Sequence, residues 1–274
     1  MDYIEYRLRE IPEEIKEILM AELSELGFES FAETGEGLDA YVPVSSFKEE
    51  AEEYLTLKIR KLGIKFERET IREQNWNALW ESQYEPVIIA GKCMVRAPFH
   101  DPLPGILYDI LIEPRMSFGT AHHETTALML EMLLREDLTN YKVLDMGCGT
   151  GVLGILASKM GASGVDAIDT DEWAFGNCRD NVGKNNLSNI SVIHGDTRNI
   201  PETVYNMILA NINRNVLLED LPVYGRHLAE SGSLFLSGFY EKDMAAIRNR
   251  AEEQGLTLIC SESKNNWVGA KFVK

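Results

Sequence analysis

The chain has 274 residues, 45% of them hydrophobic, and a formal net charge of -17 at pH 7. It is long enough to bury a sizeable core, and no segment approaches the ~20 consecutive apolar residues that a membrane span requires. So strong a negative charge, without a cluster of Lys and Arg, repels phosphate backbones and favours a basic protein partner over a nucleic acid.

The first 74 residues predict a small α+β domain with the β-α-β-β-α-β order of a ferredoxin-like fold. The expected elements are a strand at residues 3–8, a helix between Pro12 and Gly27, a hairpin at residues 28–42, a helix at residues 46–62 and a strand opening at residue 64. The first residues have neither the basic region nor the apolar core of a secretion signal, so we expect a cytoplasmic protein. Because this domain carries no cofactor motif, we assign it to substrate recognition.

Residues 75–124 predict a linker with short extended pieces rather than a regular domain, because prolines recur along this segment. Three of its aromatic residues, Trp76, Trp80 and Tyr84, are more typical of packing anchors than of a ligand cage. The segment therefore separates the first domain from the remainder of the chain.

Residues 125–274 predict a second domain in which strands and helices alternate. Strand patterns lie near Lys142, Val165, Ser191, Tyr205, Ser233 and Leu256, and residues 267–273 form a strand-like tail. This alternation indicates a doubly wound, mostly parallel sheet that ends in an antiparallel hairpin. The predicted fold class is therefore α/β, preceded by the small ferredoxin-like domain.

The clearest signal in the chain is residues 143–151, V-L-D-M-G-C-G-T-G, in which an apolar strand runs into alternate glycines. Gly147 and Gly149 lack Cβ and can adopt φ > 0, which lets a ligand approach the backbone. The spacing is G-x-G-x-G, whereas a dinucleotide pyrophosphate is typically bound by G-x-G-x-x-G at a helix N-terminus. The turn therefore favours a nucleoside cofactor without phosphate, and S-adenosylmethionine is the leading candidate.

Polar residues stand at the carboxyl ends of successive predicted strands, where an open α/β sheet binds ligands; they are Asp145, Asp169, Asp196 and Asn211. Asp169 follows the glycine turn by about twenty residues, and its carboxylate can accept hydrogen bonds from ribose hydroxyls. An acid at this place has the same role in NAD-binding proteins, so Asp169 alone does not distinguish the two cofactors. The other three favour S-adenosylmethionine over NAD. Asp145 either orients the cofactor's amino group or holds the turn through backbone N–H groups, and Asp196 either contacts the adenine or is an ordinary turn residue.

Residues 118–126, F-G-T-A-H-H-E-T-T, resemble the F-G-T-G-x-H-x-T-T signature of the bacterial PrmA family, which methylates the large-subunit ribosomal protein L11. Residues 209–212 resemble the family's fourth-strand motif, residues 237–238 a later strand-end motif, and the stretch from Trp76 to Pro86 its tryptophan-bearing linker. The resemblance covers essentially the whole chain. It implies a Rossmann-like class I methyltransferase that uses S-adenosylmethionine to N-methylate lysine and N-terminal amines of that ribosomal protein.

Carried over position by position, the family's cofactor contacts fall on Thr126, Gly147, Asp169 and Asn211. Thr126 is also a candidate cap for the helix that it opens. The chain departs from the family at Ala121, where glycine is usual and alanine disfavours φ > 0. It departs again at Asn265 and Asn266, which precede Trp267 where acids are often found.

Methyl transfer from a sulfonium is an in-line displacement, so the chief requirements are alignment and a neutral amine. At pH 7, deprotonating a lysine of pKa ~10.4 costs about 4.6 kcal/mol. Asn211 is the candidate catalytic residue, because its side-chain oxygen can accept a hydrogen bond from the amine and orient it. His122 and His123 either accept the proton or cap and orient the backbone.

The leading interpretation is a protein methyltransferase, with an RNA or small-molecule methyltransferase on the same fold and a non-catalytic cofactor-binding module as the alternatives. No N-P-P-[YF] motif occurs at Asn211, which argues against RNA bases, while Asp169 together with Asn211 argues against an inactive module. The four cysteines are scattered and lack the spacing of metal ligands, so no metal is expected. The acidity then matches a basic substrate, unless it serves solubility alone.

Overall fold

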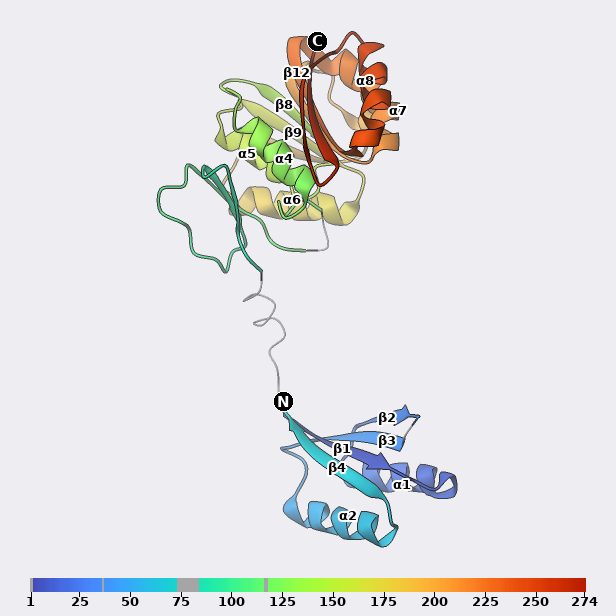
Figure 1. The fold of residues 1–274 in the computed structure, drawn as a ribbon. Coiled ribbons are helices and arrows are strands. Elements are labelled where there is room, and N and C mark those ends of the chain that lie inside the picture. The colour runs from blue at the N-terminus through green and yellow to red at the C-terminus, as the bar shows by residue number, and fades with distance from the viewer. Residues whose placement is uncertain (1, 36, 73–83, 116–117) are drawn as a thin grey trace. The chain divides into compact units, whose positions relative to one another are not determined.

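The computed structural model describes residues 2–35, 37–72, 84–115 and 118–274, and the chain divides into two compact units, residues 1–83 and 84–274 (Figure 1). Trp76 and Trp80, which belong to the motif expected in the linker, lie outside the described residues. Among the helices of the described part, none is long and apolar enough to cross a membrane.

The first unit has a four-stranded antiparallel sheet in the order β2-β3-β1-β4, with two helices in its connections. Its elements are β1 (Tyr3–Arg9), α1 (Glu13–Glu25), β2 (Ser30–Thr34), β3 (Gly37–Pro43), α2 (Glu49–Lys61) and β4 (Lys65–Ile71). This order confirms the ferredoxin-like arrangement predicted from the sequence.

Side chains of β1 alternate between the two faces of this sheet, as the pleat of a strand requires. Ile4, Tyr6 and Leu8 are buried and pack in one core with apolar side chains of both helices, such as Leu23 of α1 and Ile59 of α2. Because every second side chain of this strand is apolar and points to the same face, both helices pack against that face of the sheet.

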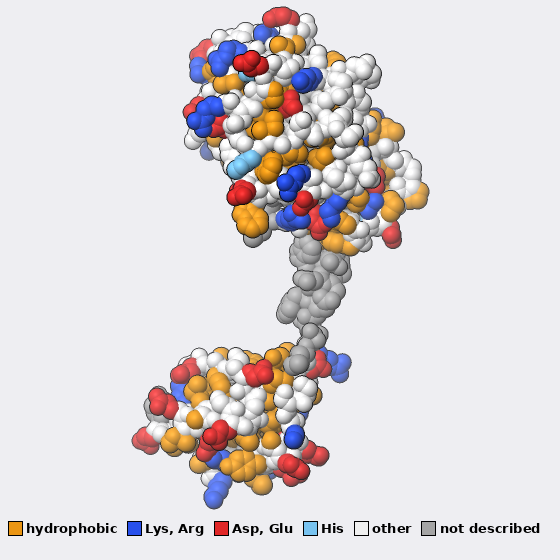
Figure 2. Space-filling view, turned by 180° about the vertical axis from the view of Figure 1, so that it is seen from behind, with side chains coloured by type: hydrophobic (Ala, Val, Ile, Leu, Met, Phe, Trp, Pro, Cys, Tyr) orange, Lys and Arg blue, Asp and Glu red, His pale blue; other side chains and the backbone are white. Residues whose placement is uncertain are grey.

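The other face of the same sheet is charged. The Arg7 guanidinium lies 2.6 Å from Glu5 and 2.8 Å from Glu69, and that of Arg9 lies 2.6 Å from Asp39. Figure 2, seen from behind, shows acidic side chains spread over the first unit with apolar ones between them. The open face of the sheet is thus covered by ion pairs rather than by a helix.

The second unit contains a seven-stranded sheet in the order β10-β9-β8-β11-β12-β14-β13. Its elements are β5 (Val87–Ile89), β6 (Cys93–Arg96), β7 (Tyr108–Leu111), α4 (Glu124–Leu133), β8 (Lys142–Met146), α5 (Val152–Lys159), β9 (Gly164–Asp169), α6 (Glu172–Lys184), β10 (Ile190–His194), η1 (Thr197–Asn199), β11 (Tyr205–Asn211), α7 (Arg214–His227), β12 (Leu228–Tyr240), η2 (Glu241–Asp243), α8 (Met244–Glu252), β13 (Thr257–Lys264) and β14 (Trp267–Val273). Strands β8 to β12 pair in parallel, whereas β14 pairs antiparallel with both β12 and β13. The predicted parallel sheet with a terminal antiparallel hairpin is confirmed.

Helices cover both faces of this sheet (Figure 1). One core contains Leu130 of α4, Ile155 of α5 and Cys178 of α6, and a second core contains Leu221 of α7 and Ile247 of α8. Parallel strands that are buried on both faces carry apolar side chains on each face, and these side chains pack in both cores. The arrangement confirms the predicted doubly wound, Rossmann-like architecture.

The strand order changes direction beside β8. From β8 the chain moves outward to β9 and β10, and it then returns to β11 on the other side of β8. In doubly wound folds, the carboxyl ends of the strands at such a point border a crevice for ligands. A site is therefore expected at the loops that follow β8, β9 and β11.

Residues 84–115 belong to the second unit, although the sequence analysis assigns them to the linker. Their three-stranded sheet, in the order β5-β6-β7, places Ile89 and Ile110 in the same core as α4 and α5. The Leu111 N–H donates to Asn185 Oδ1 at 3.1 Å, and Asn185 Nδ2 donates to the Leu111 carbonyl at 2.7 Å. Because these partners are 74 positions apart, a local pattern could not reveal how the short strands are held.

Candidate functional site

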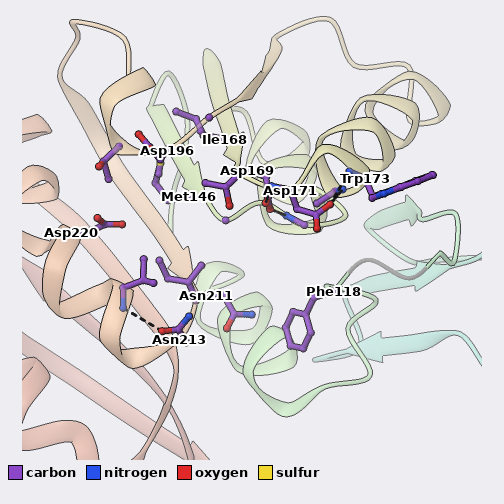
Figure 3. A pocket seen from close by; sticks show the side chains of 18 of the residues that line it. Phe118, Met146, Ile168, Asp169, Asp171, Trp173, Asp196, Asn211, Asn213 and Asp220 are labelled. Atoms are coloured by element: carbon purple, nitrogen blue, oxygen red, sulfur yellow. Dashed lines mark hydrogen bonds between the residues drawn. The ribbon is translucent and has the colours of Figure 1, made fainter.

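A cavity of about 1260 Å³ opens at the carboxyl ends of β8, β9 and β11 (Figure 3). A volume of this order accommodates a nucleoside-sized ligand. Five residues selected from the sequence line it, namely Gly147, Gly149, Asp169, Asp196 and Asn211. The two other selected residues, Thr126 and Asp145, do not line the cavity and are buried beside it.

The glycine turn after β8 forms one wall, and its two central glycines have positive φ angles of 67° at Gly147 and 56° at Gly149. A Cβ at Gly147 would lie 2.2 Å from Ile212 Cγ2, and one at Gly149 would lie 2.3 Å from the Phe118 carbonyl oxygen. Both conformation and space therefore require glycine at these two positions, and both residues line the cavity.

Asp169 stands at the tip of β9, with its carboxylate fixed by two backbone donors. Its Oδ2 accepts the Gly149 N–H at 2.8 Å, and its Oδ1 accepts the Asp171 N–H at 3.0 Å. Each oxygen keeps a further lone pair for a hydroxyl donor. The side chain thus holds the glycine turn and presents a positioned acceptor to the cavity.

Asp196 lines the cavity after β10, but its charge is already paired. Its two oxygens accept from Arg198 Nε at 3.0 and 3.1 Å, Oδ2 accepts from a terminal guanidinium nitrogen at 2.6 Å, and Oδ1 caps the Arg198 backbone N–H. These hydrogen bonds from Arg198 lower the pKa of Asp196 to about 2. Asp196 therefore acts as a turn residue as well as a wall of the cavity.

Asn211 ends β11 and projects toward the cavity. Its Nδ2 donates to the Thr126 hydroxyl of α4 at 3.2 Å, which fixes the plane of the amide. Its Oδ1 is buried and has no hydrogen-bond partner within the part of the chain that the structure describes. A buried acceptor without a partner is costly, so Oδ1 is available to a donor brought by a ligand.

Asp145 points away from the cavity, toward α5. Its carboxylate is 1% exposed and accepts the Gly154 N–H at 2.9 Å. The contact ties β8 to the helix that follows the glycine turn. Of the two roles predicted for Asp145, the structure thus shows the one in which it accepts a backbone N–H group.

Burial raises the pKa of Asp145 from an ordinary value of 3.8 to about 7, and the nearby charge of Asp169 adds to this effect. Between pH 4 and 7 the folded state therefore holds one proton more than the unfolded chain, so stability falls as pH rises toward 7. In urea unfolding at pH 5, 6.5 and 8, we expect the free energy of unfolding of the wild type to fall relative to that of Asp145→Asn by on the order of 2 kcal/mol. A difference that stays constant over this range would show that the carboxyl group is ionised throughout.

Four aromatic rings form a continuous series that starts at Phe118 in the cavity wall. Phe118 lies 5.0 Å from His123, His123 lies 4.9 Å from Trp267, and Trp267 stacks on Tyr240 at 4.0 Å between ring centroids. His123 also accepts the Thr125 N–H at the start of α4. This histidine thus has the capping contact that was one of its two predicted roles.

The signature loop keeps its backbone shape despite its departure from the family pattern. Ala121 has a φ of 66°, so the left-handed conformation expected for glycine is retained by alanine. His122, next to it, contacts the Glu85 carbonyl oxygen through Nε2 at 2.9 Å. Near Trp267, Asn265 Nδ2 donates to Glu124 at 2.8 Å and so ties the hairpin to α4.

Several cavity residues were missed because no motif marks them; they are Arg115, Trp173, Val216, Glu219 and Asp220. The last three stand at i, i+3 and i+4 on α7 and thus share one face of the helix, which is the only signal that could have grouped them. With the backbone turn, the fixed carboxylate and the open amide oxygen, they complete a site suited to a nucleoside that carries a reactive group.

A model of the family described as ribosomal protein L11 methyltransferase (PrmA) matches residues 14–274 of the chain. The chain is 43% identical over 283 residues to the ribosomal protein L11 methyltransferase of Porphyromonas gingivalis, covering 99% of this chain and 98% of that protein. It is 40% identical over 279 residues to the protein of the same name from Phocaeicola vulgatus, covering 100% and 99%.

The fold is similar to the crystal structure of a ribosomal protein L11 methylase from Lactobacillus delbrueckii subsp. bulgaricus, with a TM-score of 0.65, 24% identity and coverage of 69% of this chain and 98% of that chain. A methyltransferase from Pyrococcus furiosus gives a TM-score of 0.51 at 18% identity, covering 60% and 88%. By the match over nearly its whole length, the chain belongs to the ribosomal protein L11 methyltransferase (PrmA) family, a family of enzymes.

Proposed function

We propose that this enzyme uses S-adenosylmethionine to methylate ribosomal protein L11 at lysine side-chain amines and at the N-terminal amine. Membership of the family supports the protein substrate. We choose an amine as the methyl acceptor because of Asn211 Oδ1. This buried oxygen lies at the edge of the cavity and has no hydrogen-bond partner in the described part of the chain. An amine brings the N–H donor that this oxygen lacks.

The cavity residues fit S-adenosylmethionine, which supplies an electrophilic methyl group when it is bound. The backbone at Gly147 and Gly149 would accept close contact, and Asp169 would accept hydrogen bonds from the ribose hydroxyls. We assign Thr126 and Asp145 a supporting part, because Thr126 holds Asn211 and Asp145 anchors α5 behind the turn.

Asn211 is the residue that we expect to touch the reacting amine. A lysine must lose its proton first, at a cost of about 4.6 kcal/mol at pH 7, and removal from water lowers this cost. An amine that donates one N–H to Asn211 Oδ1 has its lone pair held in a fixed direction. Thr126 keeps the amide from rotating, so that the oxygen rather than the nitrogen faces the substrate.

We assign recognition of L11 to the first unit, residues 1–83. The described residues that line the cavity all belong to the second unit. The charged sheet face around Glu5, Arg7 and Glu69 suits a basic protein better than a nucleic acid. Because the proposed substrate is a ribosomal protein, we also propose that the reaction takes place in the cytoplasm.

Transfer of a radiolabelled methyl group to purified L11 tests this proposal, with the full chain compared with residues 84–274. We expect the full chain to label L11, and the shortened chain to bind S-adenosylmethionine with unchanged affinity in calorimetry but to label L11 at least about 10-fold more slowly. Equal labelling rates would refute the recognition role of the first unit. A full chain that binds the cofactor and leaves L11 unlabelled would refute the proposed substrate.

A further inference from the structure

Asp220 of α7 is a half-buried carboxylate in the cavity wall, and within the described residues no Lys, Arg or His pairs with it. Its Oδ2 accepts the Tyr224 hydroxyl at 3.0 Å, while Oδ1 has no protein donor in the same part of the chain. Burial raises the pKa of Asp220, and the charged neighbours that act on it, Glu219 and Asp196, are both acidic. A partly desolvated carboxylate of this kind is costly unless a ligand brings a donor to it.

Asp196, on the facing wall, differs from Asp220 because both of its oxygens already accept hydrogen bonds. Its oxygens are occupied by the side-chain and backbone donors of Arg198. Figure 3 shows Asp196 and Asp220 at one end of the cavity and Phe118 at the other, with Asp169 between them. Asp196 is thus saturated by Arg198, whereas the half-buried Asp220 keeps an oxygen open to a ligand, and Glu219 beside it on α7 is exposed.

The order of these residues along the cavity indicates which part of a ligand reaches Asp220. The reacting amine belongs beside Asn211, and Asp169 at the tip of β9 suits the ribose. The base of the nucleoside then lies beyond the ribose, toward Asp196 and Asp220. Apolar side chains of Met146, Ile168 and Val216 line the same cavity and offer a surface on which a flat base can pack.

We propose that Asp220 binds the exocyclic amino group of the cofactor's adenine base and thereby selects adenine over bases that carry an oxygen at that position. The inference rests on the proposed use of S-adenosylmethionine. The amino group is a hydrogen-bond donor that matches the free Oδ1. A carbonyl oxygen in its place would face the carboxylate as a second acceptor and leave both groups unpaired.

Tyr224 is a positioning residue in this arrangement. It lies one helical turn after Asp220 on α7, is buried, and holds Oδ2 through its hydroxyl. The carboxylate is thereby restricted in rotation, so that Oδ1 stays directed away from Tyr224. Tyr224→Phe keeps the ring and removes only this hydrogen bond, so it should weaken the preference for adenine less than Asp220→Ala does.

The test is calorimetric binding of S-adenosylhomocysteine and of S-inosylhomocysteine, in which an oxygen replaces the amino group, at pH 8 to the full-length protein. We expect the wild type to bind the adenine compound at least about 10-fold more tightly, and Asp220→Ala to lose about 10-fold in affinity for it and most of the preference. Glu202→Ala removes an exposed carboxylate outside the cavity and should leave both affinities unchanged. Asp220→Leu, which is similar in size but has no hydrogen-bond acceptor, provides the same comparison if the alanine variant fails to fold.

An unchanged preference for adenine in folded Asp220 variants would overturn this inference and leave the proposed function intact. The same holds if the wild type binds both compounds equally, because no residue then selects the amino group. If the wild type binds neither compound, the proposed cofactor fails and the inference fails with it.

Discussion

Replacing Asn211 by alanine is expected to slow methyl transfer to L11 by about 30- to 1000-fold, which corresponds to on the order of 2–4 kcal/mol of transition-state stabilisation. The variant loses the buried Oδ1 that we assign to the amine, and it also loses the Nδ2 contact with Thr126 that fixes the geometry. Single-turnover methylation at saturating cofactor and L11 measures this loss apart from binding.

Asn215→Ala is the matched control for this variant. Asn215 is the second residue of α7, is exposed and does not line the cavity, so its loss should leave the transfer rate unchanged. A near-wild-type rate for Asn211→Ala at saturation would reduce Asn211 to a residue of structure or binding.

Replacing Asp169 by alanine is expected to weaken binding of S-adenosylmethionine by about 10- to 100-fold. The variant removes the acceptor proposed for the ribose and also frees the Gly149 N–H, which loosens the glycine turn. Calorimetry gives the affinity, and circular dichroism shows whether the variant is folded. Unchanged affinity in a folded variant would mean that this strand end is not where the ribose binds.

Structural features that depend only on neighbouring residues could be predicted from short-range patterns in the sequence. Residues 3–8 were correctly predicted as a strand, and the spacing of Gly147 and Gly149 predicted a turn in which positive φ angles are allowed. Both follow from local geometry, because strand pleating and left-handed backbone conformations are properties of a few consecutive residues.

Features set by contacts between distant parts of the chain could not be predicted in the same way. Residues 84–115 were predicted to belong to a linker because prolines recur there. Their strands have only three or four residues, and Asn185 of α6 holds one of them from 74 positions away. At Asp145 the motif placed an acid at a strand end, but packing of α5 against β8 decides that the carboxylate contacts Gly154 rather than the cavity. Asp220 joins the site only because α7 returns beside β11.

Ala121 shows a further limit of reasoning from residue type. Alanine disfavours a positive φ, yet Ala121 has a φ of 66° and is only 2% exposed. Packing of its methyl group in the core shared by α4 and α5 offsets a conformational cost of roughly 1–2 kcal/mol. A preference of this size is readily overridden by tertiary contacts.

Peptide mapping of L11 by mass spectrometry, after incubation with the enzyme and S-adenosylmethionine, shows whether this cavity directs a methyl group to the amines of L11. We expect added methyl groups on lysine side-chain nitrogens and on the N-terminal nitrogen, with the wild-type pattern largely absent at early times for Asn211→Ala. Methyl groups found instead on carboxylates or on RNA, or an unmodified L11 in the presence of an enzyme that binds the cofactor, would contradict this expectation.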